Sequence, residues 1–475
     1  MRTLIKNGHV VTVNASHAVF DGGFVAIRDD RIEAVGLGGG ESFGPFDEIV
    51  DASGMIVIPG LINAHQHPWM NLVKGLADGL LLEPWIFRFV QPFLNAITVE
   101  DVRVSAYLSA LEMVRTGTTC VLDHTTRLPD GYEDALIAPM AEVGIRHMMA
   151  KQFQCRTPKL SDFPLSASEA QDGVVDLVRR YDKANDGLTR IALAIECNAH
   201  HTELGKSSDE LVLAGHEVAC RENLRIPVHM SGGTLSMSMG FLKYLRLTGR
   251  RDVEYLERLG VLDERWILKH GIHFSDRDIE MVRTRGSHVI YTPTSEAIRG
   301  GGFGPVAKLH AAGINCALGS DGPAVDYSVD MVEQMKACLY LQRVKHRDGQ
   351  LLDAATVLEM ATINAAVALG MADSIGSIEP GKLADIAIFD LSSPRLAPIA
   401  DPLLALVCAA RGADAHTVFV NGRMLLRGGA FAQFKDADRV VAEASERGRR
   451  IAAQAKLGGS GQAAWPAPAP AQVAE

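Results

Sequence analysis

The clearest chemical pattern in the chain begins with His65 and His67, in the run VIPGLINAHQH. The two histidines stand two residues apart at the end of an apolar, strand-like segment. Because side chains on a strand alternate, this spacing turns both imidazoles to the same side. Two nitrogens that converge on one point favour a metal-binding site. An isolated His-x-His pair is weak evidence by itself, since two histidines can also cap a strand.

Three further candidate ligands end apolar runs later in the chain. His229 ends RIPVHM, His270 ends RWILKH and Asp321 ends NCALGSD. Neutral imidazoles and a carboxylate suit zinc, iron or another first-row divalent ion. A ligand set that leaves one position vacant is typical of a catalytic rather than a structural metal site. The five residues together therefore predict a catalytic metal centre.

Asp321 and His270 are the candidate catalytic residues of this centre. A bound divalent ion lowers the pKa of its water toward neutrality and supplies hydroxide. We expect Asp321 to bind the metal, accept the proton of that water and pass it to the leaving group. His270 could ligate the metal or hydrogen-bond the atom under attack, and the sequence leaves both roles open.

Repeated β-α units must position these residues. Apolar runs rich in Val and Ile alternate with longer segments of helical period, which is typical of a buried parallel sheet. In a (β/α)8 TIM barrel the carboxyl ends of the strands form the catalytic mouth, and the candidate ligands fall at such ends. A doubly wound open sheet is the alternative, but no glycine-rich nucleotide loop supports it. The expected strands span residues 55–65, 119–124, 146–152, 190–197, 225–230, 265–270, 287–293 and 315–321.

The two ends of the chain differ from the middle in their hydrophobic pattern. Hairpin-like runs in residues 1–54 and 372–430 predict a small β-sandwich domain built from both termini. We expect residues 55–371 to form the barrel and residues 431–457 to form a C-terminal helix. The Gly-, Pro- and Ala-rich residues 458–475 predict a disordered tail. The fold class is therefore α/β.

Composition excludes several classes of protein. The net charge of the 475 residues is -10, and no Lys/Arg-rich run could follow a phosphate backbone, so no nucleic-acid partner is expected. No apolar segment approaches the roughly 18 residues of a membrane span, and the N-terminus does not read as an export signal. Seven scattered cysteines without a CxxC motif favour reduced thiols and a cytoplasmic location.

Several motifs resemble those of the amidohydrolase superfamily, in the branch of triazine hydrolases, cytosine and guanine deaminases, and phenylurea and thiocarbamate hydrolases. The runs are VIPGLINAHQH, KHGIHFSD, GSDGPAVDYSVDM, EMATINAAVALGM and IGSIEPGKLADIAIFDL, and the similarity covers about residues 1 to 430. The resemblance implies that the metal positions are His65, His67, His229, His270 and Asp321. The fourth strand carries no Lys that could bridge two metals, which implies one divalent ion per subunit, zinc first, with Fe, Co or Mn as alternatives. Similar proteins are commonly dimers or larger, which implies a homo-oligomer.

The sequence departs from the family pattern at three places. Gly232, in HMSGG, stands where deaminases and triazine hydrolases usually carry a Glu that moves a proton to a ring nitrogen. Glu296 replaces a usual Asn; it could be a relocated acid/base, a partner for a substrate ammonium group or a solvated loop residue. Asn198 replaces the fourth-strand His of many members, with His200 and His201 nearby. We take Asn198, His201 and Glu296 as candidate substrate residues.

Aromatic residues follow the first expected barrel strand, where the substrate pocket of a barrel is built. Trp69, Trp85, Phe87 and Phe89 could form an apolar wall for an aromatic or alkyl group, or could pack in the core. Trp69 and Trp85 are the candidate substrate residues of this group.

The missing Glu decides the predicted reaction. Amides, ureas and carbamates need only an activated carbonyl and a protonated amine, so we expect hydrolysis of such a non-peptide carbon-nitrogen bond in a small, largely apolar molecule (EC 3.5). The alternative is a deaminase or chlorohydrolase of an N-heterocycle such as a triazine, cytosine or guanine. A catalytically silent, metal-stabilised binding protein is a third reading, motivated by the same missing Glu. Neither a membrane nor a nucleic acid is expected as a partner.

Overall fold

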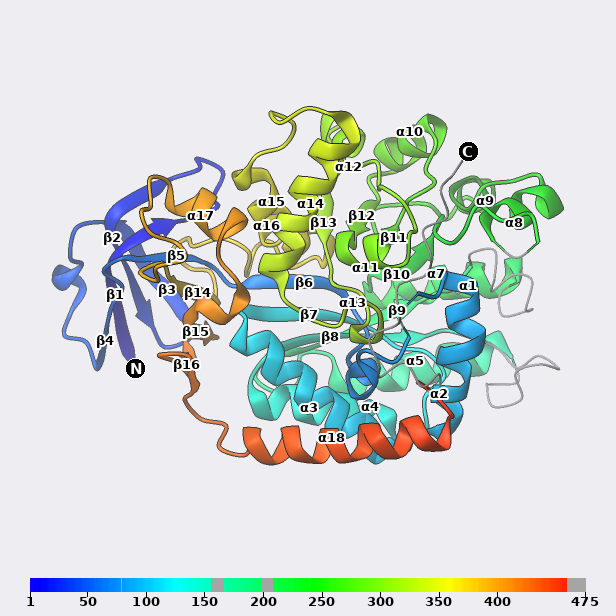
Figure 1. The fold of residues 1–475 in the computed structure, drawn as a ribbon, viewed down its shortest axis with the longest axis horizontal. Coiled ribbons are helices and arrows are strands. Elements are labelled where there is room, and N and C mark those ends of the chain that lie inside the picture. Colours follow the sequence, from blue (N-terminus) through cyan, green and yellow to red (C-terminus); the bar gives the residue numbers. More distant parts are fainter. Residues whose placement is uncertain (78, 155–165, 198–207, 239, 459–475) are drawn as a thin grey trace, which may run out of the picture.

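Two four-stranded parallel sheets form the centre of the protein. The computed structural model describes residues 1–77, 79–154, 166–197, 208–238 and 240–458. The strands lie side by side in chain order within each sheet (Figure 1). The first sheet contains β6 (Leu61–Gln66), β7 (Thr118–His124), β8 (Arg146–Gln152) and β9 (Thr189–Ala194). The second contains β10 (Ile226–Met230), β11 (Trp266–His270), β12 (His288–Tyr291) and β13 (Cys316–Leu318).

Backbone hydrogen bonds join the edges of the two sheets. The Leu193 N–H donates to the Arg225 carbonyl at 2.9 Å, which links β9 to the residue before β10. The Asp321 N–H donates to the His65 carbonyl at 2.9 Å, which links the segment after β13 to β6. This circular order of eight parallel strands is consistent with the expected (β/α)8 barrel.

The first expected barrel strand consists of two strands. β5 (Met55–Pro59) pairs with β1 and β14 of a separate sheet, and β6 begins the first parallel sheet at Leu61. The chain changes direction at Gly60, where a Cβ would lie 2.1 Å from Thr119 Oγ1. An apolar run does not reveal such a change of sheet, because both halves are buried and share the same pattern.

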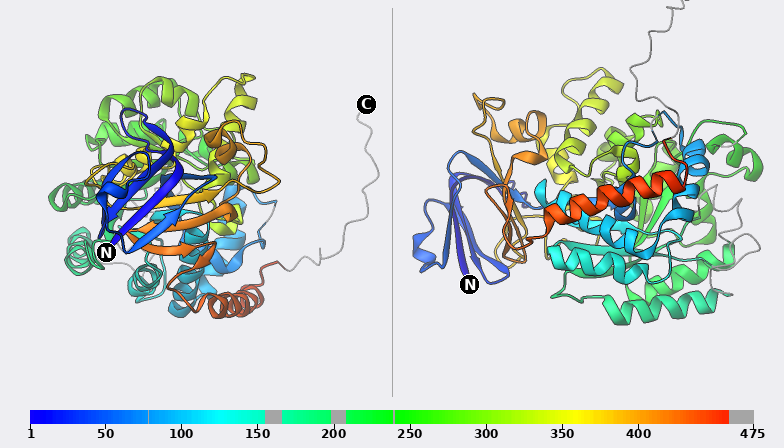
Figure 2. Two further views of the ribbon diagram at one scale, coloured as in Figure 1. Left: turned by 90° about the vertical axis from the view of Figure 1, so that its left-hand side faces the viewer. Right: turned by 60° about the horizontal axis from the view of Figure 1, so that its bottom comes forward.

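The separate sheet has nine strands, drawn from both ends of the chain. Its order is β17-β16-β15-β14-β5-β1-β2-β3, with β4 paired to β1. It lies at one end of the molecule, with the barrel beside it (Figures 1 and 2). All nine strands are linked in one ladder, so the expected two-sheet sandwich is not established. The remaining strands are β1 (Arg2–Val11), β2 (Val19–Arg28), β3 (Arg31–Leu37), β4 (Glu48–Asp51), β14 (Ile386–Asp390), β15 (Ala415–Val420), β16 (Arg423–Arg427) and β17 (Ala430–Phe431).

Helices surround the strands of the two parallel sheets (Figure 1). Several begin with side-chain caps; Thr98 and Asp101, for example, form a capping box at the start of α3. The helices are α1 (Leu82–Trp85), α2 (Gln91–Ala96), α3 (Val99–Arg115), α4 (Tyr132–Val143), α5 (Ala167–Tyr181), α7 (Asp209–Glu222), α8 (Phe241–Thr248), α9 (Asp252–Leu259), α10 (Asp276–Arg285), α11 (Pro293–Ile298), α12 (Val306–Ala311), α13 (Pro323–Asp326), α14 (Met331–His346), α15 (Ala354–Met360), α16 (Ile363–Ala368), α17 (Pro402–Cys408) and α18 (Ala437–Gln454).

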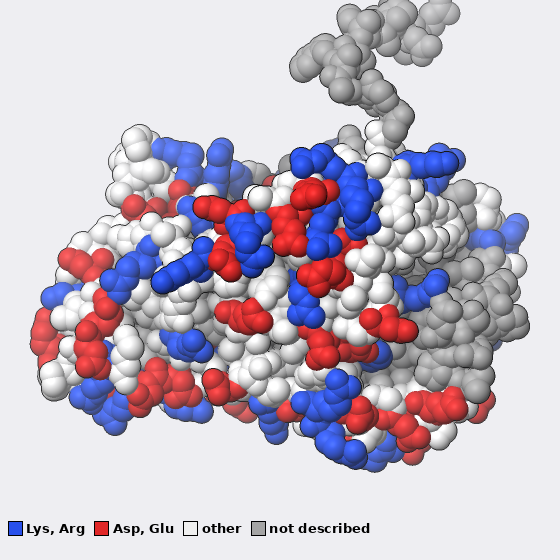
Figure 3. Space-filling model, turned by 90° about the horizontal axis from the view of Figure 1, so that it is seen from below, with Lys and Arg blue, Asp and Glu red and all other residues white. Residues whose placement is uncertain are grey.

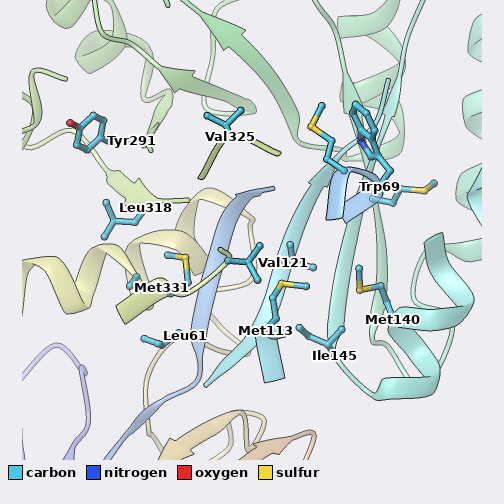
Figure 4. Close-up of a cluster of buried hydrophobic side chains, with 14 of the residues drawn as sticks. Leu61, Trp69, Met113, Val121, Met140, Ile145, Tyr291, Leu318, Val325 and Met331 are labelled. Atoms are coloured by element: carbon cyan, nitrogen blue, oxygen red, sulfur yellow. The ribbon is translucent and has the colours of Figure 1, made fainter. Parts of the chain in front are cut away.

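The main apolar core lies between the barrel strands and their helices. Figure 4 shows part of it, where Val121 of β7 and Met113 of α3 point into the same cluster. Every residue of β7 is buried, as expected for a parallel strand covered on both faces. Burial of this surface holds the strand ends, and therefore the candidate ligands, in fixed positions.

The long helix α18 packs across α3 along one side of the barrel (Figure 2). Arg447 and Arg450 of α18 both bind the buried carboxylate of Asp101. The face seen from below carries acidic and basic side chains that are intermixed (Figure 3). Within the described ranges, no helix combines the length and the apolar character needed to cross a bilayer. The tail predicted from residue 458 lies, from residue 459 on, outside the described residues.

Candidate active site

The five expected metal ligands meet at the carboxyl ends of the strands. His65 lies near the end of β6 and His67 directly follows it, His229 and His270 belong to β10 and β11, and Asp321 follows β13. The ligand atoms of His65, His229 and His270 lie within 4.8 Å of one another, as do those of His65, His67 and Asp321. Asp321 Oδ1 is 3.3 Å from His65 Nε2 and 3.4 Å from His67 Nε2. The structure thus brings all five together.

Backbone conformation at two of the strand ends helps to aim the ligands. His270 has a φ of 72° and Asp321 a φ of 65°, in the left-handed region that residues with a Cβ rarely adopt. Such conformations cluster at functional sites, because the surrounding fold must hold them in place. Gly319 adds a close approach of the chain, since a Cβ there would lie 2.7 Å from the Cβ of His65.

Three of the histidines direct Nδ1 away from the centre. His67 Nδ1 donates to the His124 carbonyl at 2.7 Å, and His229 Nδ1 is bonded to Glu196. His270 Nδ1 lies 2.8 Å from Glu296 Oε1. Since carbonyls and carboxylates accept protons in hydrogen bonds, each Nδ1 carries the hydrogen and each Nε2 keeps a lone pair. Metal-ligating histidines have this arrangement, in which an outer acceptor fixes the tautomer.

The charge state of the imidazoles also suits a cation. Burial lowers the pKa of His65 and His229 well below the usual range, and the charge of Lys269 lowers both further. These two imidazoles are therefore neutral, as metal ligands must be. His65 is fully buried; its Nδ1 has no hydrogen-bond partner, and its Nε2 faces Asp321 Oδ1 at 3.3 Å without forming a well-aligned hydrogen bond. A buried polar atom without a partner is costly, so this ring fits a position that a metal ion completes.

Asp321 is held as a carboxylate. Burial alone would raise its pKa, but contacts from His65 and His67 and the charge of Arg299 outweigh burial and hold the pKa well below the usual range. The Ser295 hydroxyl donates to Asp321 Oδ2 at 2.6 Å, and Arg299 Nη2 donates to the same oxygen at 3.3 Å. Asp321 can therefore accept a proton while its orientation stays fixed.

The metal centre opens into a cavity of about 230 Å³ with mainly apolar walls. Trp69 and Trp85, both expected to contact substrate, line it, and Phe87 does so as well. Phe89 instead stacks on Trp85 in the core, with ring centroids 6.0 Å apart. Further lining side chains are those of Met70, Leu82, Ile86, Val90, Leu94, Met230 and Phe241. A pocket of this kind suits an aromatic or otherwise apolar molecule.

Gly232 and Glu296 both line the cavity. A Cβ at Gly232 would meet nothing closer than the Cβ of His270 at 3.6 Å, so no other side chain fills the place of the usual Glu. Glu296 contacts His270 and lies 3.3 Å from Arg299 Nη2. Burial would raise the pKa of Glu296, but Arg299 and His270 lower it below its ordinary value. Glu296 is thus a buried, ionised carboxylate rather than a solvated loop residue.

Sequence reasoning missed a buried polar group beside the metal centre. Glu196 Oε1 lies 2.6 Å from His124 Nε2, and His124 Nδ1 lies 2.5 Å from Lys269 Nζ. Burial lowers the pKa of Lys269 to about 7. His124 and Lys269 lie at strand ends, and Glu196 follows β9. The same feature that predicted the metal ligands, a polar residue at the end of an apolar run, could therefore have predicted these three residues. The expected substrate residues Asn198 and His201 lie outside the described residues.

Comparisons with known proteins agree with this geometry. The model of the Amidohydrolase family matches residues 56–425. A 5-methylthioadenosine/S-adenosylhomocysteine deaminase of Acetivibrio thermocellus is 32% identical over 428 residues, which cover 90% of this chain and 94% of that protein. An adenosine deaminase from Xanthomonas campestris, solved with bound zinc, has a TM-score of 0.86 and 28% identity, with 95% of this chain and 98% of that chain covered.

The fold is also similar to that of atrazine chlorohydrolase TrzN from Arthrobacter aurescens TC1, solved with zinc. The TM-score is 0.84 at 23% identity, and the match covers 94% of this chain and 100% of that one. At this identity the similarity concerns the fold alone. The deaminases named above differ from the amide, urea or carbamate hydrolases expected from the missing Glu, and they favour the alternative reading.

Proposed function

Because this chain belongs to the amidohydrolase family and is a metal-binding hydrolase of non-peptide carbon-nitrogen bonds, we propose that it deaminates a purine-type N-heterocycle. The observation that carries the proposal is the site itself, in which four histidines and Asp321 stand at the end of an aromatic-walled cavity. The similarity to 5-methylthioadenosine/S-adenosylhomocysteine and adenosine deaminases supports an adenine-like substrate.

One divalent ion, zinc first, is the proposed cofactor, held by His65, His67, His229 and Asp321, with His270 beside it. When bound there, such an ion would act as a Lewis acid that lowers the pKa of a water molecule. Asp321 Oδ2 would take the proton of the attacking water and return it to the departing amine. The hydroxyl of Ser295 and the guanidinium of Arg299 keep this carboxylate in position.

Deamination also requires a proton at the ring nitrogen, which Gly232 cannot give. Glu196 is the proposed carrier of this proton, which it would take from the attacking water and pass to the ring nitrogen, because it lines the cavity and contacts His124 and His229. Glu296 is less suited to this role, since the positive charge of Arg299 favours its ionised form. In this arrangement Glu296 orients His270, and the apolar wall that includes Trp69 and Trp85 holds the heterocycle.

Hydrolysis of an amide, urea or carbamate is the second candidate function, and one observation supports it. The open space at Gly232 means that the usual acid is absent from its usual place. Hydrolysis of an amide, urea or carbamate needs no ring protonation and would tolerate this loss. The expected homo-oligomer and the cytoplasmic location remain proposals.

A substrate panel separates the two functions. Zinc-loaded enzyme would be assayed for ammonia release from adenosine, 5-methylthioadenosine and an aminotriazine, and for amine release from an anilide and a phenylurea. We expect turnover of the adenine compounds to exceed that of the anilide and the urea by a wide margin. Asp321→Asn serves as the control against a contaminating deaminase, and it should lower the rate about a thousandfold. Faster hydrolysis of the anilide or urea would reject deamination in favour of the second candidate.

A further inference from the structure

A second group of metal-ligating side chains lies away from the catalytic mouth. It consists of His216 and Cys220 of α7 and Asp263, which lies three residues before β11. One ligand atom from each lies within 4.8 Å of the others. Among the residues that the structure describes, it is the one such group that includes no residue of the barrel mouth.

We propose that His216, Cys220 and Asp263 form a second metal site, which takes a zinc ion completed by water. The site is independent of the proposed deamination. Its donors are an imidazole, a thiol and a carboxylate, and zinc binds all three types. Three protein ligands on an accessible surface leave the fourth tetrahedral position to solvent.

The distances between the donor atoms suit such an ion. Cys220 Sγ lies 3.8 Å from His216 Nε2, and Asp263 Oδ2 lies 2.9 Å from the same nitrogen. Tetrahedral zinc with ordinary bond lengths would place nitrogen and sulfur about 3.6 Å apart, and nitrogen and oxygen about 3.4 Å apart. Shifts of about half an ångström or less would therefore bring these pairs to the expected separations.

Local structure prepares the site. His216 and Cys220 are four residues apart on one helix, so they share a face. Cys220 lies in the last turn of α7, where the helix dipole favours a cation. The backbone of Asp263 is fixed, because its carbonyl accepts the Ser287 hydroxyl at 2.7 Å. The ligands are thus held on two elements whose positions the fold already determines.

Arg265 is the competing charge at this site. Its Nη1 lies 3.1 Å from Asp263 Oδ2 and 3.1 Å from Glu264 Oε1. When a cation takes the Asp263 oxygen, Arg265 can keep its contact with Glu264. The Cys220 thiol must also release its proton to solvent as sulfur binds zinc, so the complex forms with loss of one proton.

The position of His216, Cys220 and Asp263 indicates that a metal ion bound there would stabilise the fold and take no part in catalysis. β11 begins at Trp266, close to Asp263, and ends at His270 in the catalytic centre, so about 13 Å of strand separates the two. The group therefore lies toward the amino-terminal end of the barrel, where residues contribute to stability. A zinc ion there would tie α7 to the loop before β11.

Cobalt tests the proposal, because a cobalt ion bound to a thiolate absorbs in the near ultraviolet and the catalytic centre contains no sulfur ligand. Metal-free enzyme would be titrated with Co²⁺, and the same titration run on Cys220→Ser and on Cys408→Ser, which removes another accessible thiol. We expect the sulfur-to-cobalt band in the wild type and in Cys408→Ser, with about two cobalt ions per chain.

Cys220→Ser should lose the band and bind about one cobalt ion per chain, while zinc-loaded Cys220→Ser keeps wild-type turnover. A band that persists in Cys220→Ser, or a wild type that shows none when saturated with cobalt, would overturn the proposal. Failure of the second site leaves the substrate panel unaffected, since the two measurements use different residues and different signals.

Discussion

Two buried carboxylates, Glu196 and Glu296, stand behind different histidines of the metal centre. Glu196 contacts His229 and His124, whereas Glu296 contacts His270 and is paired with Arg299. Both line the cavity, so either could replace the acid that Gly232 lacks. Their different neighbours give them different roles in the proposed deamination.

Glu196→Gln should reduce kcat for an adenine compound by about a hundredfold or more, because the amide cannot supply the proton that the ring nitrogen needs. Glu296→Gln is the matched variant, and we expect a smaller loss, of about tenfold, through poorer orientation of His270. Metal content should stay near one ion per chain at the centre in both. A larger loss in Glu296→Gln than in Glu196→Gln would exchange the two assigned roles.

At the residue scale, the sequence predicted the ligands better than their surroundings. His65, His67, His229, His270 and Asp321 stood out because each ends an apolar run. The contacts of Glu196 and Lys269 with His124 join β7, β11 and the segment after β9, and no local pattern encodes such pairing. The ionised state of Glu296 depends on its ion pair with Arg299, and the sequence does not show that the two side chains meet.

At the scale of elements, the strand β12 carries a buried histidine that links stability to pH. His288 is 7% exposed, and its Nδ1 lies 3.1 Å from the Asn315 side-chain amide. Burial, aided by the charge of Arg225, lowers the pKa of His288 to about 4. The folded protein therefore keeps this imidazole neutral where the unfolded chain would protonate it.

His288→Asn should remove part of the acid sensitivity of the fold. As pH falls below about 6.5, the unfolded state binds a proton that the folded state refuses, so His288 lowers the free energy of unfolding until about pH 4. Between pH 7 and pH 5 the wild type should lose about 2 kcal/mol more than the variant. Denaturant unfolding of zinc-loaded protein at both pH values measures this difference. The exposed His310→Asn is the control, and equal losses in wild type and His288→Asn would contradict the assignment.

The order of the elements was predictable where buried runs alternate with helical periods, and this gave the parallel strands. The division at Gly60 was not, because β5 and the start of β6 read as one continuous apolar run and both strands are buried, although they join different sheets. What separates them is the close approach to Thr119, a contact between residues far apart in sequence. Likewise, the positive φ angles of His270 and Asp321 could not be read from the sequence, because neither residue is a glycine.

For the whole molecule, the metal centre lies where the two parallel sheets meet. His65 and His67 come from the first sheet, whereas His229 and His270 come from the second and Asp321 follows it. An ion held by these residues, as proposed, would cross-link both sheets at their carboxyl ends. Composition and periodicity predicted the α/β class, but this joining of sheets depends on bonds such as that from the Asp321 N–H to the His65 carbonyl.

Removal of metal should therefore affect stability as well as turnover. Dialysis against a chelator should abolish activity and lower the unfolding temperature by several degrees, because an ion present at a hundred times its Kd stabilises the fold by about 2.7 kcal/mol. Zinc should restore both properties. Asp321→Asn, which weakens one ligand, should show a smaller zinc-dependent shift. Cys220→Ser serves as the control that subtracts any contribution of the second site. Full turnover in enzyme shown to be free of metal would reject the metal centre as the source of catalysis. An unchanged unfolding temperature would reject its role as a link between the sheets.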